Sequence, residues 1–335
     1  MRVTLGDVCE KGSSNLKQSD VINKTGAYPI YGAAGYLGNV DFYHQDKPYV
    51  AVVKDGAGIG RTTLHPAKSS VIGTMQYLLP KSNVLPEYLY YVVQYMHLEK
   101  YFTGATIPHI YFKDYKAEQF NLDAMERQKE IVASLQKVET LIKVRQQQLQ
   151  KLDELVKARF VELFGDPLTN PKGYQEKYLS EIAEYWNGLT YKPDDVANEG
   201  TIVLRSSNIQ NASLDFADTV RVNCKIGTKK YVQDNDILMC SRNGSAKLVG
   251  KVALIKELSE PMSFGAFMMI IRSAYYPFLM TYFQLPAFRS QITTGATTTI
   301  NQITGRMLDN VKLAIPDIES AKDFSAFTNQ VDKSK

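Results

Sequence analysis

The longest regular pattern in the chain is a polar stretch without glycine or proline, which runs from Met125 to Phe164. Its apolar residues recur mostly at alternating steps of four and three, the heptad spacing of a coiled coil. These positions form an apolar seam of Ile131, Leu135, Val138, Ile142, Leu149, Leu152 and Val156. A narrow seam on one helix has nothing of its own to pack against, so we expect a partner helix to cover it.

Both ends of this stretch carry helix-boundary signals. Asp123 is a candidate N-cap, and Glu126 follows it near the positive end of the helix dipole. Gly165, followed by Asp166 and Pro167, predicts the stop, because glycine adopts the left-handed C′ conformation and proline cannot continue a helix. Residues 123–165 are therefore predicted to be helical. Roughly 40 residues at ~1.5 Å each give a rod about 60 Å long.

A lobe of mixed secondary structure is predicted on each side of the helix. In residues 1–122, β-type runs at 49–53 and 76–79 alternate with glycine-rich turns, and a helix is expected over 86–101. A linker at 166–176 leads to the second lobe, 177–317. Residues 318–335 then begin another helix with four-three spacing. The predicted fold class is α+β, with two tandem mixed α/β domains separated by a long coiled-coil-type helix and a second, shortened helix at the C-terminus.

The two lobes contain similar short segments in the same order. LGDV at residues 5–8 is echoed by LSEI at 179–182, and TGAT at 103–106 by TGAT at 294–297. Between them, Lys54 with the following Asp-Gly is matched to Arg242 with the following Asn-Gly, and Arg61 is matched to Lys251. Each second member follows the first at a nearly constant distance in sequence. The pattern predicts two related domains in tandem.

Composition narrows the class of protein without naming a partner. Apolar residues make up 44% and charged residues 22% of the chain, as in ordinary globular proteins. The formal net charge of +4 permits a nucleic-acid partner without requiring one. The three cysteines lack the spacing of a zinc site or a disulfide framework, which favours a reducing cytoplasm. Neither a signal sequence nor a membrane-spanning run is predicted, so no membrane partner is expected.

The polar loops suggest binding and not catalysis. The four histidines lack metal-ligand spacing and have no evident nucleophile beside them, so no catalytic or metal-binding residue is predicted. The loops mix bases, amides, hydroxyls and aromatics, which can read base edges and hold phosphates. Ordinary solvated loops also carry such residues, so the matched occurrence in both lobes is what favours function. The candidate DNA contacts are Tyr36, Lys54, Arg61, His109, Tyr111, Lys113, Arg205, Ser207, Asn208, Arg242, Asn243, Lys247, Thr298 and Asn301.

With the helix, the repeat and the TGAT segments placed, the chain resembles the DNA-specificity subunit of type I restriction–modification systems. The resemblance covers essentially the whole length. It is carried by LGD at 5–7, TGAT at 103–106 and 294–297, ERQKEI at 126–131, RFVELFGDP at 159–167, NPKG at 170–173 and RSSNI at 205–209.

The resemblance implies a non-catalytic protein with two target-recognition domains, each reading one half of a bipartite DNA site. It also implies partners, namely double-stranded DNA, two methyltransferase subunits and motor–nuclease subunits. S-adenosylmethionine, ATP and Mg²⁺ belong to those partners, and no cofactor is expected in this chain. The predicted rod agrees, because a rigid helix between two readers would set half-site spacing near whole turns of ~10.5 bp.

The family pattern differs at the C-terminus, where a full-length member has a distal helix running antiparallel to the central one. Here residues 318–335 are short, so the seam around 142–156 is expected to lack an intrachain partner. Another subunit or a second copy covers it, or the chain is a shortened variant. Two other hypotheses remain: a decoy that binds methyltransferase subunits without supporting a full complex, and an enzyme active on its own.

Overall fold

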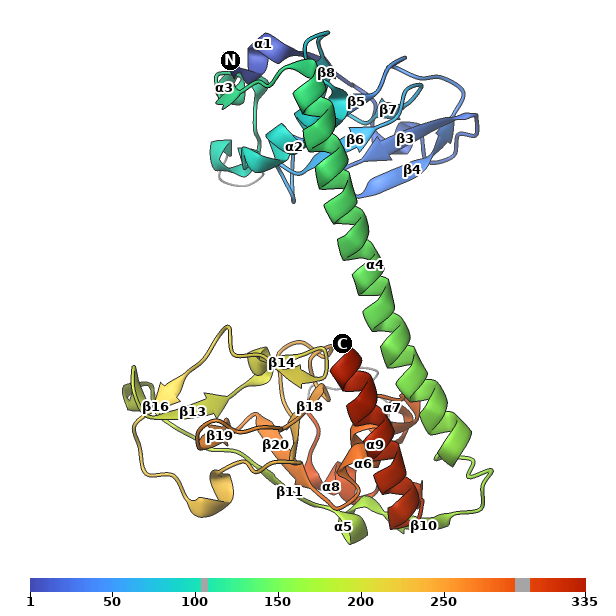
Figure 1. Ribbon diagram of the computed structural model, residues 1–335, viewed down its shortest axis with the longest axis vertical. Helices are drawn as coiled ribbons and strands as arrows, with labels where there is room; N and C mark the ends of the chain where they lie inside the picture. Colours follow the sequence, from blue (N-terminus) through green and yellow to red (C-terminus); the bar gives the residue numbers. More distant parts are fainter. Residues whose placement is uncertain (104–107, 293–301) are drawn as a thin grey trace. The chain divides into compact units, whose positions relative to one another are not determined.

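A computed structural model gives the structure, and it describes residues 1–103, 108–292 and 302–335. The chain forms two compact units, residues 1–145 and 146–335 (Figure 1). Helix α4, Met125–Phe164, contributes residues to both units, and helix α9, Ile318–Ser334, lies in the second. The predicted fold class of two tandem mixed domains, a long helix and a shorter C-terminal helix is confirmed.

The first unit is built on a four-stranded antiparallel sheet in the order β2-β8-β5-β6. Its strands are β2 (Cys9–Ser13), β5 (Tyr49–Val53), β6 (Thr62–His65) and β8 (Met75–Pro80). A second sheet has β3 (Tyr28–Gly32) between β4 (Gly35–Val40) and β7 (Ser70–Val71), and β1 (Arg2–Thr4) pairs with β9 (Gln119–Asn121). The helices are α1 (Leu5–Val8), α2 (Pro86–Tyr95), α3 (Phe112–Tyr115) and the 3-10 turns Gln18–Asp20 and Leu98–Tyr101.

Strand β5 is the centre of this unit, and all five of its residues are buried. Side chains of a strand alternate between the faces of a sheet. Val50 and Val52 therefore join the core that includes Leu89 of α2 and Val132 of α4, whereas Tyr49 and Val53 join a smaller core on the other face. The strand runs predicted at 49–53 and 76–79 correspond to β5 and part of β8.

The helix predicted over 86–101 is interrupted. Helix α2 ends at Tyr95, and His97 adopts a left-handed backbone with φ of 51°. Such a residue cannot extend the α-helical hydrogen-bond ladder, so the chain resumes as a separate 3-10 turn, Leu98–Tyr101.

The second unit has two four-stranded sheets among its described residues. The order β11-β20-β17-β18 joins β11 (Glu184–Asn187), β20 (Met268–Arg272), β17 (Ile237–Cys240) and β18 (Val252–Leu254), all antiparallel. The order β12-β16-β13-β19 joins β12 (Val196–Ala197), β16 (Arg221–Val222), β13 (Thr201–Leu204) and β19 (Met262–Phe264). Shorter pairs are β10 (Gln175–Tyr178) with β21 (Lys312–Ile315) and β14 (Ile209–Gln210) with β15 (Ser213–Leu214).

The second unit's remaining helices are short apart from α9. They are α5 (Leu179–Ile182), α6 (Tyr276–Tyr282), α7 (Pro286–Ile292), α8 (Gly305–Asp309) and 3-10 turns at Pro193–Asp195, Ser206–Asn208 and Thr228–Lys230. The C-terminal end of α4 packs here through Phe160 and Phe164, whose rings contact Phe278 of α6 and Phe324 of α9. Lys335, the residue after α9, pairs with Asp153 at 2.7 Å. Helix α9 therefore runs antiparallel to this part of α4 (Figure 1).

The predicted stop of α4 is confirmed at Gly165, which has φ of +72° and whose amide donates to the Val161 carbonyl at 2.8 Å. At the other end, the Asp123 carboxylate accepts from the Tyr88 hydroxyl at 2.7 Å. The buried amide of Gln128 accepts from the Leu85 amide at 2.9 Å, and it donates to the carbonyls of Asn83 at 3.0 Å and Asp123 at 2.9 Å. This network fastens the start of α4 to the first unit.

Candidate nucleic-acid interface

The segment after the central strand has the same backbone hydrogen bonds in both units. In the first unit the Lys54 amide donates to Thr74 at 3.0 Å, and its carbonyl accepts from Ile110 at 2.9 Å. In the second unit the Ser241 amide donates to Phe267 at 2.9 Å, and its carbonyl accepts from Ile303 at 2.7 Å. Lys54 is thus the equivalent of Ser241.

Asp55 is consequently the equivalent of Arg242, and the sequence comparison that matched Lys54 with Arg242 was wrong by one residue. That comparison matched residues of similar charge, whereas the structurally equivalent residues are those with the same backbone hydrogen bonds. The match of Arg61 with Lys251 holds, because Arg61 and Lys251 provide the carbonyls that accept from the last residues of β5 and β17, both at 2.9 Å.

In the first unit, four of the predicted DNA contacts lie in a cluster around Asp55. Its carboxylate lies 2.6 Å from Nδ1 of His109 and 4.0 Å from Nζ of Lys54. The His109 ring stacks on Tyr111 at 6.2 Å, and Lys113 lies over the Tyr111 ring at 5.6 Å. A cluster of charges and exposed rings therefore forms at the end of β5, around a carboxylate that the sequence analysis had not selected.

The two remaining candidates of the first unit lie around the turn between β3 and β4. The Arg61 guanidinium donates to the carbonyl of Ala33 at 3.1 Å, which ties the β5–β6 loop to this turn. Tyr36, on β4, is 62% exposed, and its hydroxyl donates to Asn39 at 3.1 Å.

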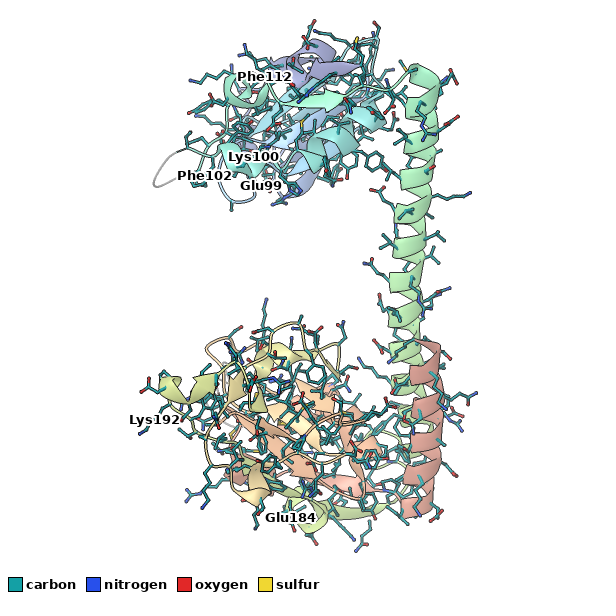
Figure 2. All side chains as sticks on the ribbon, turned by 60° about the vertical axis from the view of Figure 1, so that its left-hand side comes forward. Glu99, Lys100, Phe102, Phe112, Glu184 and Lys192 are labelled. Carbon is teal, nitrogen blue, oxygen red and sulfur yellow. The ribbon has the colours of Figure 1, made fainter. Side chains whose placement is uncertain are left out.

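The 3-10 turn before Thr103 is held by an ionised carboxylate. Lys100 pairs with Glu118, and the Tyr101 hydroxyl donates to the same carboxylate at 2.6 Å. These two bonds, led by the one from Lys100, hold the pKa of Glu118 below its usual value. Figure 2 labels Lys100 together with Phe102, whose ring is 60% exposed two residues further on. Phe102 is therefore, like Tyr111, an exposed aromatic side chain in a loop of this unit.

In the second unit, the equivalent cluster is centred on Arg242. Its guanidinium lies over the exposed ring of Phe267 at 5.4 Å. The neighbouring Asn243 donates to the Ser206 hydroxyl at 3.1 Å and so joins the loops that carry Ser207 and the exposed Lys247. Phe267 was not predicted, because a single aromatic residue in a turn has no sequence signature. The structure places it here, because its carbonyl accepts from Ser241 as the carbonyl of Thr74 accepts from Lys54.

Two other candidates in the second unit have internal roles. Asn208 is completely buried, and its amide bonds the Arg205 amide and the carbonyls of Asp215 and Asp218 at 2.8 to 2.9 Å. Arg205 makes two hydrogen bonds of 2.8 Å to the Asp218 carboxylate. These contacts explain both residues as supports of the turn after β13. Thr298 and Asn301 lie outside the described residues.

The apolar seam of α4 is covered over only part of its length. Leu149, Leu152 and Val156 are half-buried in the second unit, and Ile131 is half-buried in the first. Leu135, Val138 and Ile142 are between 37% and 53% exposed, and the polar residues beside them on α4 are exposed as well. The exposed part was expected at 142–156, and only Ile142 of the seam residues in that range is exposed. The exposed part therefore begins earlier, at Leu135, and the later part is half-buried where Lys335, the residue after α9, reaches Asp153.

No group of three or more histidine, cysteine, aspartate or glutamate side chains in the described part of the chain could hold a metal ion. Nor is any helix among these residues long and apolar enough to cross a membrane.

Comparison with known families matches most of the chain. The family described as type I restriction modification DNA specificity domain matches residues 1–154 and 171–335. The chain belongs to this DNA specificity family. The resemblance noted from the short motifs is thereby confirmed, and the two matched segments contain both clusters of this specificity chain.

Solved structures show the same fold. One is the S subunit of a type I restriction–modification system from M. genitalium, with a TM-score of 0.61 and 14% identity over 100% of this chain and 89% of that one. Another comes from work on complex assembly and conformational transition of the type I R-M system, with a TM-score of 0.53, 15% identity and coverage of 100% and 90%. The specificity chain therefore shares a fold with these proteins at low sequence identity.

Proposed function

We propose that this chain is a non-catalytic DNA-reading subunit, in which each unit recognises one half of a bipartite target. The repeated backbone plan around Asp55 and Arg242 is the observation that carries the proposal. Two readers with the same framework and different side chains would recognise two different short sequences. Helix α4 is shared by both units, so it would set the distance between the two half-sites.

The chemistry of the two clusters supports DNA as the ligand. The first cluster combines Lys54, His109, Tyr111 and Lys113, and the second combines Arg242 with amide and hydroxyl groups. Arginine and amide side chains read base edges in the major groove, whereas lysines and hydroxyls hold phosphates. Because these side chains are held by backbone pairing at strand ends, they would meet DNA without much rearrangement.

The exposed part of the apolar seam supports a docking role toward methyltransferase subunits. Fully burying a leucine, isoleucine or valine side chain contributes about 1.5–3 kcal/mol. The three exposed seam residues, Leu135, Val138 and Ile142, would therefore contribute several kcal/mol if partner helices covered them. In this account two methyltransferase subunits bind, motor–nuclease subunits join them, and those partners hold S-adenosylmethionine, ATP and Mg²⁺.

The test is to reconstitute the chain with a methyltransferase subunit and S-adenosylmethionine on a library of random DNA, and to sequence the methylated molecules. The proposal predicts one split motif with a fixed spacer. Assembly without methylation would instead assign the decoy role, and methylation by the isolated chain would identify an enzyme.

A pair of seam variants tests docking in the same assay. Ile142→Glu places a charge on the exposed seam and is expected to abolish assembly. Gln147→Glu adds the same charge to α4 at an exposed position outside the seam and should leave assembly intact. Equal assembly of the two variants would contradict docking through the seam.

A further inference from the structure

The equivalence of Asp55 and Arg242 extends to the segment opposite each of them. Asp55 forms an antiparallel bridge with His109, and Arg242 forms one with Gln302. The hydrogen bonds from Ile110 to Lys54 and from Ile303 to Ser241 hold these bridges in the two units. One backbone framework therefore presents a carboxylate in the first unit and a guanidinium in the second.

The framework does not depend on these side chains. In the first unit, the Gly56 amide also donates to the Pro108 carbonyl at 3.0 Å, so main-chain bonds join the two segments in addition to the side-chain contact between Asp55 and His109. In the second unit, the main-chain bridge forms although the facing side chains are an arginine and a glutamine. The two units share the backbone at this position but carry opposite charges there, so the position can determine which ligand group each unit binds.

Asp55 is held in a defined orientation but retains capacity to bind. One carboxylate oxygen lies 2.6 Å from Nδ1 of His109, and the other lies 4.0 Å from Nζ of Lys54. A carboxylate has about four lone-pair sites, so these contacts leave it able to accept another hydrogen bond. Its side chain is 31% exposed.

A carboxylate near DNA is repelled by phosphates, so a favourable contact requires a hydrogen-bond donor on the DNA. In the major groove those donors are the exocyclic amino groups, N4 of cytosine and N6 of adenine. The guanidinium of Arg242, which lies over the Phe267 ring at 5.4 Å from its centroid, has the opposite preference. An arginine that contacts a ring through its face keeps its edge N–H groups available, and it pairs with O6 and N7 of guanine.

We propose that Asp55 and Arg242 are equivalent specificity-determining residues of opposite polarity. Asp55 accepts from the amino group of a cytosine or adenine in one half-site, and Arg242 donates to a guanine in the other. This inference rests on the proposed function, and it adds the class of base that each unit recognises at this position.

The test uses the full chain in its complex with a methyltransferase subunit, on the same random library. Asp55→Ala is expected to lower discrimination roughly 10- to 100-fold at one base pair of one half-site. Arg242→Ala should do the same at one base pair of the other half-site. All remaining positions of the motif should keep the preference of the unmodified chain.

Exposed residues of the same charge outside the two clusters provide controls. Asp46→Ala, in the loop between β4 and β5, and Arg306→Ala, on α8, replace exposed residues, and they should leave every position of the motif unchanged. If either alanine variant at the test positions fails to assemble, Asp55→Asn and Arg242→Gln replace it. Each is expected to change the preference at the same single base pair.

Several results would overturn the inference while leaving the proposed function intact. The motif could be unchanged in the variants, methylation could fall equally on all sequences, or one variant could relax the preference in both half-sites. The affected base could also be one other than cytosine or adenine for Asp55, or other than guanine for Arg242. The absence of any sequence preference in the unmodified complex would instead reject the proposed function itself.

Discussion

Gln128 offers a sharp test of how α4 is joined to the first unit. Its side chain is completely buried, and its amide makes three hydrogen bonds, to the Leu85 amide and to the carbonyls of Asn83 and Asp123. Gln128 also lies within the ERQKEI segment that first suggested the family. A glutamine is suited to this position, because its amide hydrogen-bonds to backbone groups from both the β8–α2 loop and the start of α4.

The size of the effect follows from those three bonds. Each contributes about 0.5–1.5 kcal/mol net, and removing the amide leaves three backbone groups without that partner. We expect Gln128→Met, which keeps the side chain's length, to lower the free energy of unfolding of the first unit by about 3 kcal/mol. In a unit of this size, such a loss lowers Tm by roughly 6–12 °C.

Gln136→Met is the matched control, because Gln136 lies on the same helix and is exposed. It should stay within about 0.5 kcal/mol of the unmodified protein. Denaturant unfolding of the full chain, combined with amide hydrogen exchange at Leu85, measures both variants and assigns the loss to the first unit. If Gln128→Met and Gln136→Met unfold alike, the buried amide does not stabilise the attachment of α4.

Two further predictions concern stability. Burial lowers the pKa of His65 to about 4, so the unfolded chain binds more protons than the folded chain between pH ~6.5 and ~4. The free energy of unfolding therefore falls as the pH drops through this window, by up to about 3 kcal/mol. His65→Phe should flatten that pH profile in denaturant unfolding, and an unchanged slope would count against it. Phe160→Ala should destabilise the second unit by about 3–5 kcal/mol, because its fully buried ring contacts three others. Val161→Ala, at a half-exposed neighbouring position, should lower the stability far less in thermal unfolding. Equal losses for the two variants would contradict a core role for the Phe160 ring.

The elements with strong periodicity were predictable from the sequence. The four-three spacing and the glycine at 165 predicted α4 closely, because a long amphipathic helix is determined by local pattern and by its stop signal. The apolar run at 49–53 predicted β5 for a similar reason. The break at His97 could not be predicted, since neither glycine nor proline marks it and a left-handed histidine leaves no pattern in sequence.

The candidate site was predictable only as a set of loops. Lys54, His109 and Arg242 could be predicted from their residue types, but Asp55 could not, because a lone aspartate beside a glycine is typical of an ordinary turn. Asn208 was also predicted as a contact, but its burial depends on long-range hydrogen bonds. The one-residue error in matching the two units has the same origin, because equivalence is set by strand pairing and not by charge.

The most direct test of the account is single-molecule sequencing of methylated bases in DNA from cells that make this chain together with a matching methyltransferase subunit. We expect one split motif with a fixed spacer, which disappears when the chain is deleted and changes in only one half when Arg242 is replaced. Methylation at a continuous, unsplit motif, or at the same sites with and without the chain, would contradict it.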